Sequence, residues 1–190
     1  MTGEMGYLQL RLAEAGADDW LTVLAYGITA LLAWRAKGRA VSRIAQREAG
    51  FWCATGVALV LLGINELLDL QTLLTETGRS LAREQGWYRE RREFQLWFMA
   101  VLSVAAAICA AIAVWWFRAS RPAVLFAMAG FGLLGAFVLL RAASFHHTDQ
   151  FLQRGLEAFD FGAVLETSGI LVVAISALLY ARRATGRAQT

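Results

Sequence analysis

The fold is decided by one apolar segment near the middle of the chain, residues 94–117, which reads FQLWFMAVLSVAAAICAAIAVWWF. It contains no charged residue, and about 20 apolar helical residues suffice to cross the ~30 Å hydrocarbon core of a bilayer. Trp97 and Trp116 are 19 residues apart, a separation of ~28 Å along a helix. Tryptophan prefers the headgroup level at both membrane surfaces. Residues 94–117 are therefore predicted to form a transmembrane helix.

The composition extends this prediction to the whole chain. Of the 190 residues 58% are hydrophobic and 17% are charged, and the mean hydropathy is +0.49, whereas roughly a quarter of the residues of a soluble domain are charged. Four further apolar runs occupy residues 20–36, 51–70, 123–141 and 162–181. Each is long enough, or nearly long enough, to span the hydrocarbon core as a helix. The sequence predicts an all-α integral membrane protein, a bundle of five transmembrane helices in a single domain, residues 1–190.

Local signals favour helices at the expected places. Asp18 and Asp19 precede the first run, Pro122 precedes the fourth and Asp160 precedes the fifth, and these residue types are favoured where helices begin. Residues 130–135 match the G-x-G-x-x-G pattern of dinucleotide-binding folds, but no strand precedes them. We interpret these glycines as small residues that allow close helix packing.

Basic residues predict the orientation in the membrane. They gather between the first and second runs, between the third and fourth, and after the fifth: Arg35, Lys37, Arg39, Arg43 and Arg47; Arg118 and Arg121; Arg182, Arg183 and Arg187. Cytoplasmic segments are enriched in such residues, so the N-terminus is expected outside and the C-terminus in the cytoplasm, in a bacterial-type plasma membrane. The net charge of +3 is too small to indicate a nucleic-acid partner.

Two connections on the non-cytoplasmic side, residues 71–93 and 151–161, are predicted to form short interfacial helices. The first contains aromatic and basic residues that could contact lipid headgroups, namely Trp87, Tyr88, Arg91 and Arg92. They could anchor the connection at the interface. Alternatively, the arginines could receive the phosphate or carboxylate of a headgroup.

Polar residues interrupt the apolar runs at the same predicted side of the membrane. Ionisable groups at membrane depth are costly and tend to face a partner, a cavity or the bundle interior. The spacing of Asn65, Glu66 and Asp69 places them on one helical face. Together with residues of the fourth and fifth runs they predict a ligand pocket lined by Asn65, Glu66, Asp69, Arg141, Ser144, His147 and Glu166.

A divalent metal ion is one candidate ligand, with His146, His147, Asp149 and Glu66 as the possible donors. Carboxylates outnumber arginines there, and a cation, a cationic ligand or protonation could balance the charge. Adjacent histidines point to different sides of a regular helix, so both could bind one metal only if the helix unwinds near Phe145.

Several functions are compatible with this pattern. The leading hypothesis is an accessory or assembly component with a polar ligand- or metal-binding pocket near the non-cytoplasmic face, in contact with the lipid bilayer and with other membrane subunits or further copies of itself. The alternatives are a metal-dependent membrane hydrolase acting on a lipid at the interface and a lipid- or quinone-binding subunit. A structural interpretation also stands, in which Arg141 pairs with Glu66 or Glu166 and locks helices together.

Overall fold

The structure is a computed structural model that describes residues 15–40, 43–68, 91–144 and 161–186. These residues form α2 (Ala17–Lys37), α3 (Arg43–Leu68), α5 (Arg91–Phe117), α6 (Pro122–Ser144) and α8 (Phe161–Gly186). No strand occurs among them, so the all-helical prediction is confirmed. The predicted interfacial helices fall almost entirely outside the described residues. Residues 91–93 belong to α5, and Phe161 begins α8.

Four of these helices are long and apolar enough to cross a membrane. Their apolar spans are Gln46–Leu68, Ala100–Phe117, Pro122–Arg141 and Phe161–Arg182, in agreement with four of the five predicted runs. The largest difference lies in α3, which begins at Arg43 rather than near Phe51. Helix α2 is not among the four, since its apolar run is short and ends at Arg35 and Lys37.

Helix α2 nevertheless presents an apolar face to the outside. From Leu21 onward its large exposed side chains recur every three or four positions; with the adjacent Trp20 they are Trp20, Leu21, Leu24, Ile28, Leu31 and Trp34. Its opposite face is buried against the other helices. Such an apolar stripe is unfavourable in water and suits contact with lipid beside the four spans. Membrane crossing by α2 stays a prediction.

Two of the predicted helix start signals are present in the structure. The backbone N–H of Gly16 donates a hydrogen bond to Asp19 Oδ2 over 3.0 Å at the beginning of α2. Pro122 is the first residue of α6, where its missing N–H costs no helical hydrogen bond. Asp160 lies outside the described residues.

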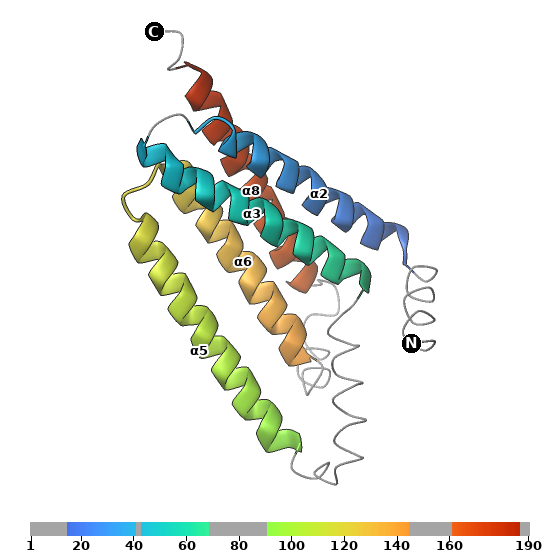
Figure 1. The fold of residues 1–190 in the computed structure, drawn as a ribbon. Helices are drawn as coiled ribbons and strands as arrows, with labels where there is room; N and C mark the ends of the chain where they lie inside the picture. The colour runs from blue at the N-terminus through green and yellow to red at the C-terminus, as the bar shows by residue number, and fades with distance from the viewer. Residues whose placement is uncertain (1–14, 41–42, 69–90, 145–160, 187–190) are drawn as a thin grey trace, which may run out of the picture.

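Helices α2, α3, α6 and α8 pack together, and α5 lies beside this bundle (Figure 1). Helix α2 runs antiparallel to α3, because Trp34 lies against Gly56 and Tyr26 lies against Gly63. Helices α6 and α8 are also antiparallel (Figure 1). We call the end at which α3 and α6 begin the Glu48 end, and the end at which they finish the Glu66 end.

The core of the bundle consists of two layers of buried apolar residues. The layer toward the Glu48 end contains Ala33, Ala36, Trp52, Ala123, Val124, Ala127, Ala177 and Tyr180. The layer toward the Glu66 end contains Tyr26, Ala30, Leu59, Leu134, Ile170 and Val173. Small residues of α2, α6 and α8 alternate with large ones, which allows close helix approach.

Two glycines, Gly130 of α6 and Gly169 of α8, lie at a close contact between these helices. A Cβ atom added to Gly130 would lie 2.8 Å from Val173 Cγ2 and 3.0 Å from the carbonyl oxygen of Gly169. The packing interpretation of the glycine motif is therefore confirmed at Gly130. At Gly132 and Gly135 an added Cβ would meet nothing within 4 Å among the described residues, so these glycines make no close helix contact there, and the interpretation stays a prediction for them.

We predict that Gly130→Ala destabilises the folded protein by about 1–3 kcal/mol, because overpacking a close contact forces backbone shifts. Gly132→Ala is the matched control in the same helix and should be neutral or slightly stabilising, since alanine is the better helix former. Thermal unfolding in detergent compares the two variants. Equal stability of both would contradict the assigned contact.

Candidate functional site

The Glu66 end of the bundle holds an ion pair between two membrane helices. Arg141, near the end of α6, donates from Nη1 to Glu66 Oε2 of α3 over 2.6 Å. The side chains are 26% and 12% exposed, respectively, so both are largely removed from solvent or lipid. The Arg141 guanidinium also lies 5.8 Å from the centre of the Phe137 ring. Of the two predicted partners of Arg141, Glu66 and Glu166, the pair with Glu66 is present.

A second polar contact lies beside this pair. The hydroxyl of Tyr26, in α2, donates to Glu166 Oε1 of α8 over 2.9 Å, and both side chains are buried. Glu66 and Arg141 are close enough to Tyr26 to contribute to its electrostatic environment. Each of the four bundle helices thus contributes one residue to what we call the Glu66 cluster: Tyr26, Glu66, Arg141 and Glu166.

The chemistry of the Glu66 cluster follows from its composition. It contains two carboxyl groups, one guanidinium and one phenol. The buried ion pair costs desolvation energy that good geometry and further hydrogen bonds can offset. If both carboxyl groups ionise, one arginine leaves a negative charge, which a bound cation, a cationic ligand or a proton could balance. The two contacts of the cluster can therefore hold the four bundle helices together.

The other predicted pocket residues are not brought into this cluster by the described structure. Asn65 is half-buried in α3. Ser144 is the last residue of α6, and its side chain is outside the described part. Asp69, His147, Trp87 and Tyr88 lie outside the described residues, while Arg91 and Arg92 begin α5 with side chains that are likewise outside it. Their proposed contacts with ligand or lipid headgroups stay predictions.

A metal centre is not found among the described residues, which contain no group of three or more histidine, cysteine, aspartate or glutamate side chains suited to a metal ion. His146, His147 and Asp149 lie outside the described residues, so their part in the predicted metal site is untested. Glu66, the fourth predicted donor, already binds Arg141.

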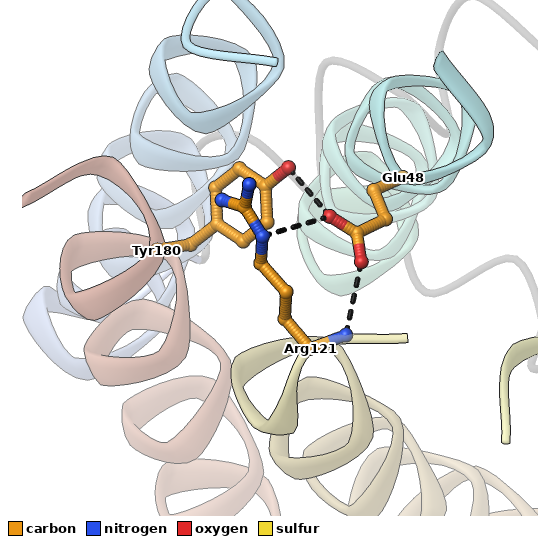
Figure 2. Close-up of polar contacts among 3 residues, drawn as sticks. All are labelled: Glu48, Arg121 and Tyr180. Atoms are coloured by element: carbon orange, nitrogen blue, oxygen red, sulfur yellow. Dashed lines mark hydrogen bonds and ion pairs between the residues drawn. The ribbon is translucent and has the colours of Figure 1, made fainter. Parts of the chain in front are cut away.

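A second polar cluster, at the Glu48 end, was not predicted from the sequence (Figure 2). Glu48 of α3 is only 2% exposed and accepts hydrogen bonds from the Tyr180 hydroxyl over 2.7 Å and from the Arg121 backbone N–H over 2.9 Å. Arg121 Nε lies 3.6 Å from the same carboxylate. We call Glu48, Arg121 and Tyr180 the Glu48 cluster.

The position of Glu48 at the beginning of α6 has a clear electrostatic reason. The first N–H groups of a helix lack partners within the helix and carry a partial positive charge, which a carboxylate stabilises. The Arg121 guanidinium adds a full charge on the same carboxylate and lies 5.0 Å from the centre of the Tyr180 ring. Glu48 therefore links α3 to α6 through Arg121 and to α8 through Tyr180.

The signal for this cluster was present in the sequence but ambiguous. Glu48 is the only acidic residue between residues 20 and 65, yet it directly follows a basic segment, as a residue of a solvated charged flank also would. A sequence does not show that a residue near the helix start turns inward. Tyr180 lies near the end of an apolar run, where interfacial aromatic residues are also common.

The two clusters lie at matching positions on α3 and α6. Glu48 and Glu66 are 18 residues apart, and Arg121 and Arg141 are 20 residues apart, which correspond to ~27 Å and ~30 Å along a helix. Both separations are close to the ~30 Å hydrocarbon thickness. The clusters therefore fit at the two edges of the membrane core.

We predict that Glu66→Gln and Arg141→Gln are coupled. Each single substitution should destabilise the protein because it leaves a partly buried group unpaired. The double variant should lose less than the sum of the two, by about 1–2 kcal/mol. A double-mutant cycle of unfolding free energies in detergent measures this coupling, and additive effects would argue against an energetically important ion pair.

We predict that Tyr180→Phe destabilises the protein by about 1–3 kcal/mol, because it removes a donor to the buried Glu48 carboxylate. Ser176→Ala, also in α8, is the matched control. Its buried hydroxyl donates only to Val172 of its own helix, over 2.6 Å, a bond that contributes little to stability. Thermal unfolding should show the larger loss for Tyr180→Phe, and an equal or larger loss for Ser176→Ala would refute the prediction.

Comparison with known proteins finds no match to any protein-family model, to any curated protein or to any solved structure. A functional hypothesis for the chain therefore has to rest on its own geometry. That geometry comprises a four-helix bundle fastened by a polar cluster at each end, and an additional apolar helix beside it.

Proposed function

We propose that this membrane protein is an accessory or assembly component, in which the bundle is a rigid platform and α5 is the helix that contacts a partner subunit. The observation that carries the proposal is the exposure of α5. None of its apolar span is buried within the chain, whereas 28% to 33% of each of the other three spans is buried.

The way in which α5 is attached to the bundle supports a role of this helix in contacting a partner subunit. Its aromatic contacts with the bundle lie at its C-terminal end, where Phe117 packs against Phe51 with ring centres 5.2 Å apart and Arg47 lies 4.6 Å from the centre of the Trp116 ring. Residues 100–112 are all exposed. Among the described side chains, the aromatic contacts therefore hold α5 at its C-terminal end, and residues 100–112 are open to lipid or to another protein.

The surface chemistry of α5 also suits a helix partner. Its exposed residues include a face of small side chains at spacings of three and four: Ala100, Ser103, Ala107 and Ala110. Small residues let transmembrane helices approach closely and gain van der Waals contact. A second copy of the chain or another membrane subunit could pack against this face.

The polar pocket belongs to the same proposal and lies at the Glu66 cluster. We favour a cation or a cationic group as its ligand, because the cluster contains two carboxyl groups, Glu66 and Glu166, and one guanidinium. The hydrolase alternative is less favoured, since Glu66, one of its candidate carboxylate ligands, already pairs with Arg141. The lipid- or quinone-binding alternative has no specific support at this cluster.

Site-specific photo-cross-linking tests the role of α5. A photoreactive residue at Val104 or Val114, which lie on or beside the small-residue face and are 58% and 54% exposed, is compared with one at Leu171 or Ile175 of α8, which are 55% and 54% exposed. We expect the α5 positions alone to give one protein adduct of defined mass, identified by mass spectrometry. An adduct at twice the 20.9 kDa chain mass would identify a second copy.

Two results would contradict the assembly proposal. One is the absence of a protein adduct from the α5 positions in native membranes, which would indicate contact with lipid alone. The other is equal cross-linking from α5 and α8, which would indicate random collision. Because the four positions match in exposure and polarity, differences in probe environment do not explain a selective result.

Metal analysis of the purified protein separates the proposal from the hydrolase alternative. We expect no stoichiometric transition metal in the wild type. Stoichiometric metal that is lost in both His147→Ala and Glu66→Gln would instead favour the metal-dependent hydrolase. Arg141→Ala, which leaves every predicted donor in place, is the control for a general loss of folding.

A further inference from the structure

Two arginines lie over two adjacent tryptophans where α3 and α5 meet at the Glu48 end. The guanidinium of Arg47 is 4.6 Å from the centre of the Trp116 ring, and that of Arg118 is 5.8 Å from the centre of the Trp115 ring. The two indole rings are 6.4 Å apart. All four residues are exposed, so the arrangement is open to a ligand.

The charges of this arrangement are not balanced by nearby acidic residues. Among the described residues, Glu48 is the only carboxylate at this end of the bundle, and it is buried against Arg121 and Tyr180. Within the part of the chain that the structure describes, Arg47 and Arg118 therefore face the outside with positive charge and no carboxylate partner.

The position of these four residues at the edge of the apolar spans indicates which kind of ligand they could bind. The span of α3 begins at Gln46 and that of α5 ends at Phe117, so Arg47 and Arg118 lie at the edge of the apolar region. Tryptophan at such a position lies at the headgroup level. Exposed apolar side chains of α5, including Ile108 and Ile112, continue from there toward the membrane centre. A ligand here meets positive charge at the headgroup level and apolar surface below it.

We propose that the Arg47–Trp116 and Arg118–Trp115 pairs form a binding site for an anionic phospholipid. A guanidinium stacked on an aromatic face keeps its in-plane N–H groups available, and their fork geometry matches two phosphate oxygens. The phosphate would lie between the two arginines, and an acyl chain would run along α5. A lipid in this position would contact both α3 and α5, which otherwise share few contacts. This site is distinct from the Glu66 cluster and does not depend on a partner of α5.

Native mass spectrometry of the purified full chain in detergent tests this site. We titrate phosphatidylglycerol and, separately, phosphatidylcholine with the same acyl chains. The wild type should bind one phosphatidylglycerol molecule more tightly than phosphatidylcholine. The double variant Arg47→Gln/Arg118→Gln should bind phosphatidylglycerol roughly tenfold more weakly, as expected for the loss of charged hydrogen bonds.

Two further double variants distinguish a specific lipid site from nonspecific electrostatic attraction between anionic lipid and the basic end of the bundle. Arg35→Gln/Arg182→Gln removes the same charge from exposed arginines at the same end of the bundle and should retain wild-type affinity. Arg47→Lys/Arg118→Lys keeps the charge but loses the planar fork, and should weaken binding. It also serves as the test variant if the glutamine variant does not fold.

Three outcomes would overturn the proposal. These are equal losses in the Arg35/Arg182 and Arg47/Arg118 glutamine variants, wild-type affinity in the lysine variant, and equal wild-type binding of the two lipids. Because the readout is lipid bound to isolated protein, cross-linking of α5 to a partner can fail or succeed independently.

Discussion

Charge burial in a membrane is the constraint on which the rest of this structure depends. A carboxylate in a low-dielectric medium has to be paired, hydrogen-bonded or protonated. Glu48 and Glu66, at opposite ends of one helix, each meet an arginine of α6. The two pairs fix α3 and α6 in parallel and in register. The hydrogen bond from Tyr180 to Glu48 joins α8 to α3, and the hydrogen bond from Tyr26 to Glu166 joins α2 to α8.

The two clusters differ in their capacity to do more than hold helices together. At the Glu48 end, one carboxylate receives a hydroxyl, a backbone N–H and a guanidinium, so its charge is well balanced. At the Glu66 end, Arg141 pairs with Glu66, and Tyr26 donates to a second carboxyl group, that of Glu166. A structural role therefore suits both clusters, and the proposed ligand-binding role concerns the Glu66 cluster, which contains two carboxyl groups.

Both proposed interactions, with a protein partner and with an anionic lipid, involve α5, because the polar clusters lie within the four-helix bundle. Helix α5 offers a small-residue face along its length, and its C-terminal end carries two tryptophans beside unbalanced arginines. A protein partner and an anionic lipid would use different parts of the same helix. A lipid bound between α3 and α5 could also restrict the orientation of α5 relative to the bundle, and so the orientation in which α5 contacts the proposed partner.

Four membrane spans, a helix start near Asp19, a helix start at Pro122, and the pairing of Arg141 with one of two carboxylates, Glu66 or Glu166, could be predicted from the sequence, because length, apolarity and the cost of buried charge follow from the residue types. The Glu48 cluster and the separation of α5 from the bundle were decided only by the tertiary structure. A charged residue at a helix start can face either outward or inward, and the sequence does not distinguish these directions. For α5 the reason is more general: lipid chains are as apolar as leucine, so a membrane helix has the same hydrophobic pattern whether it faces lipid or protein.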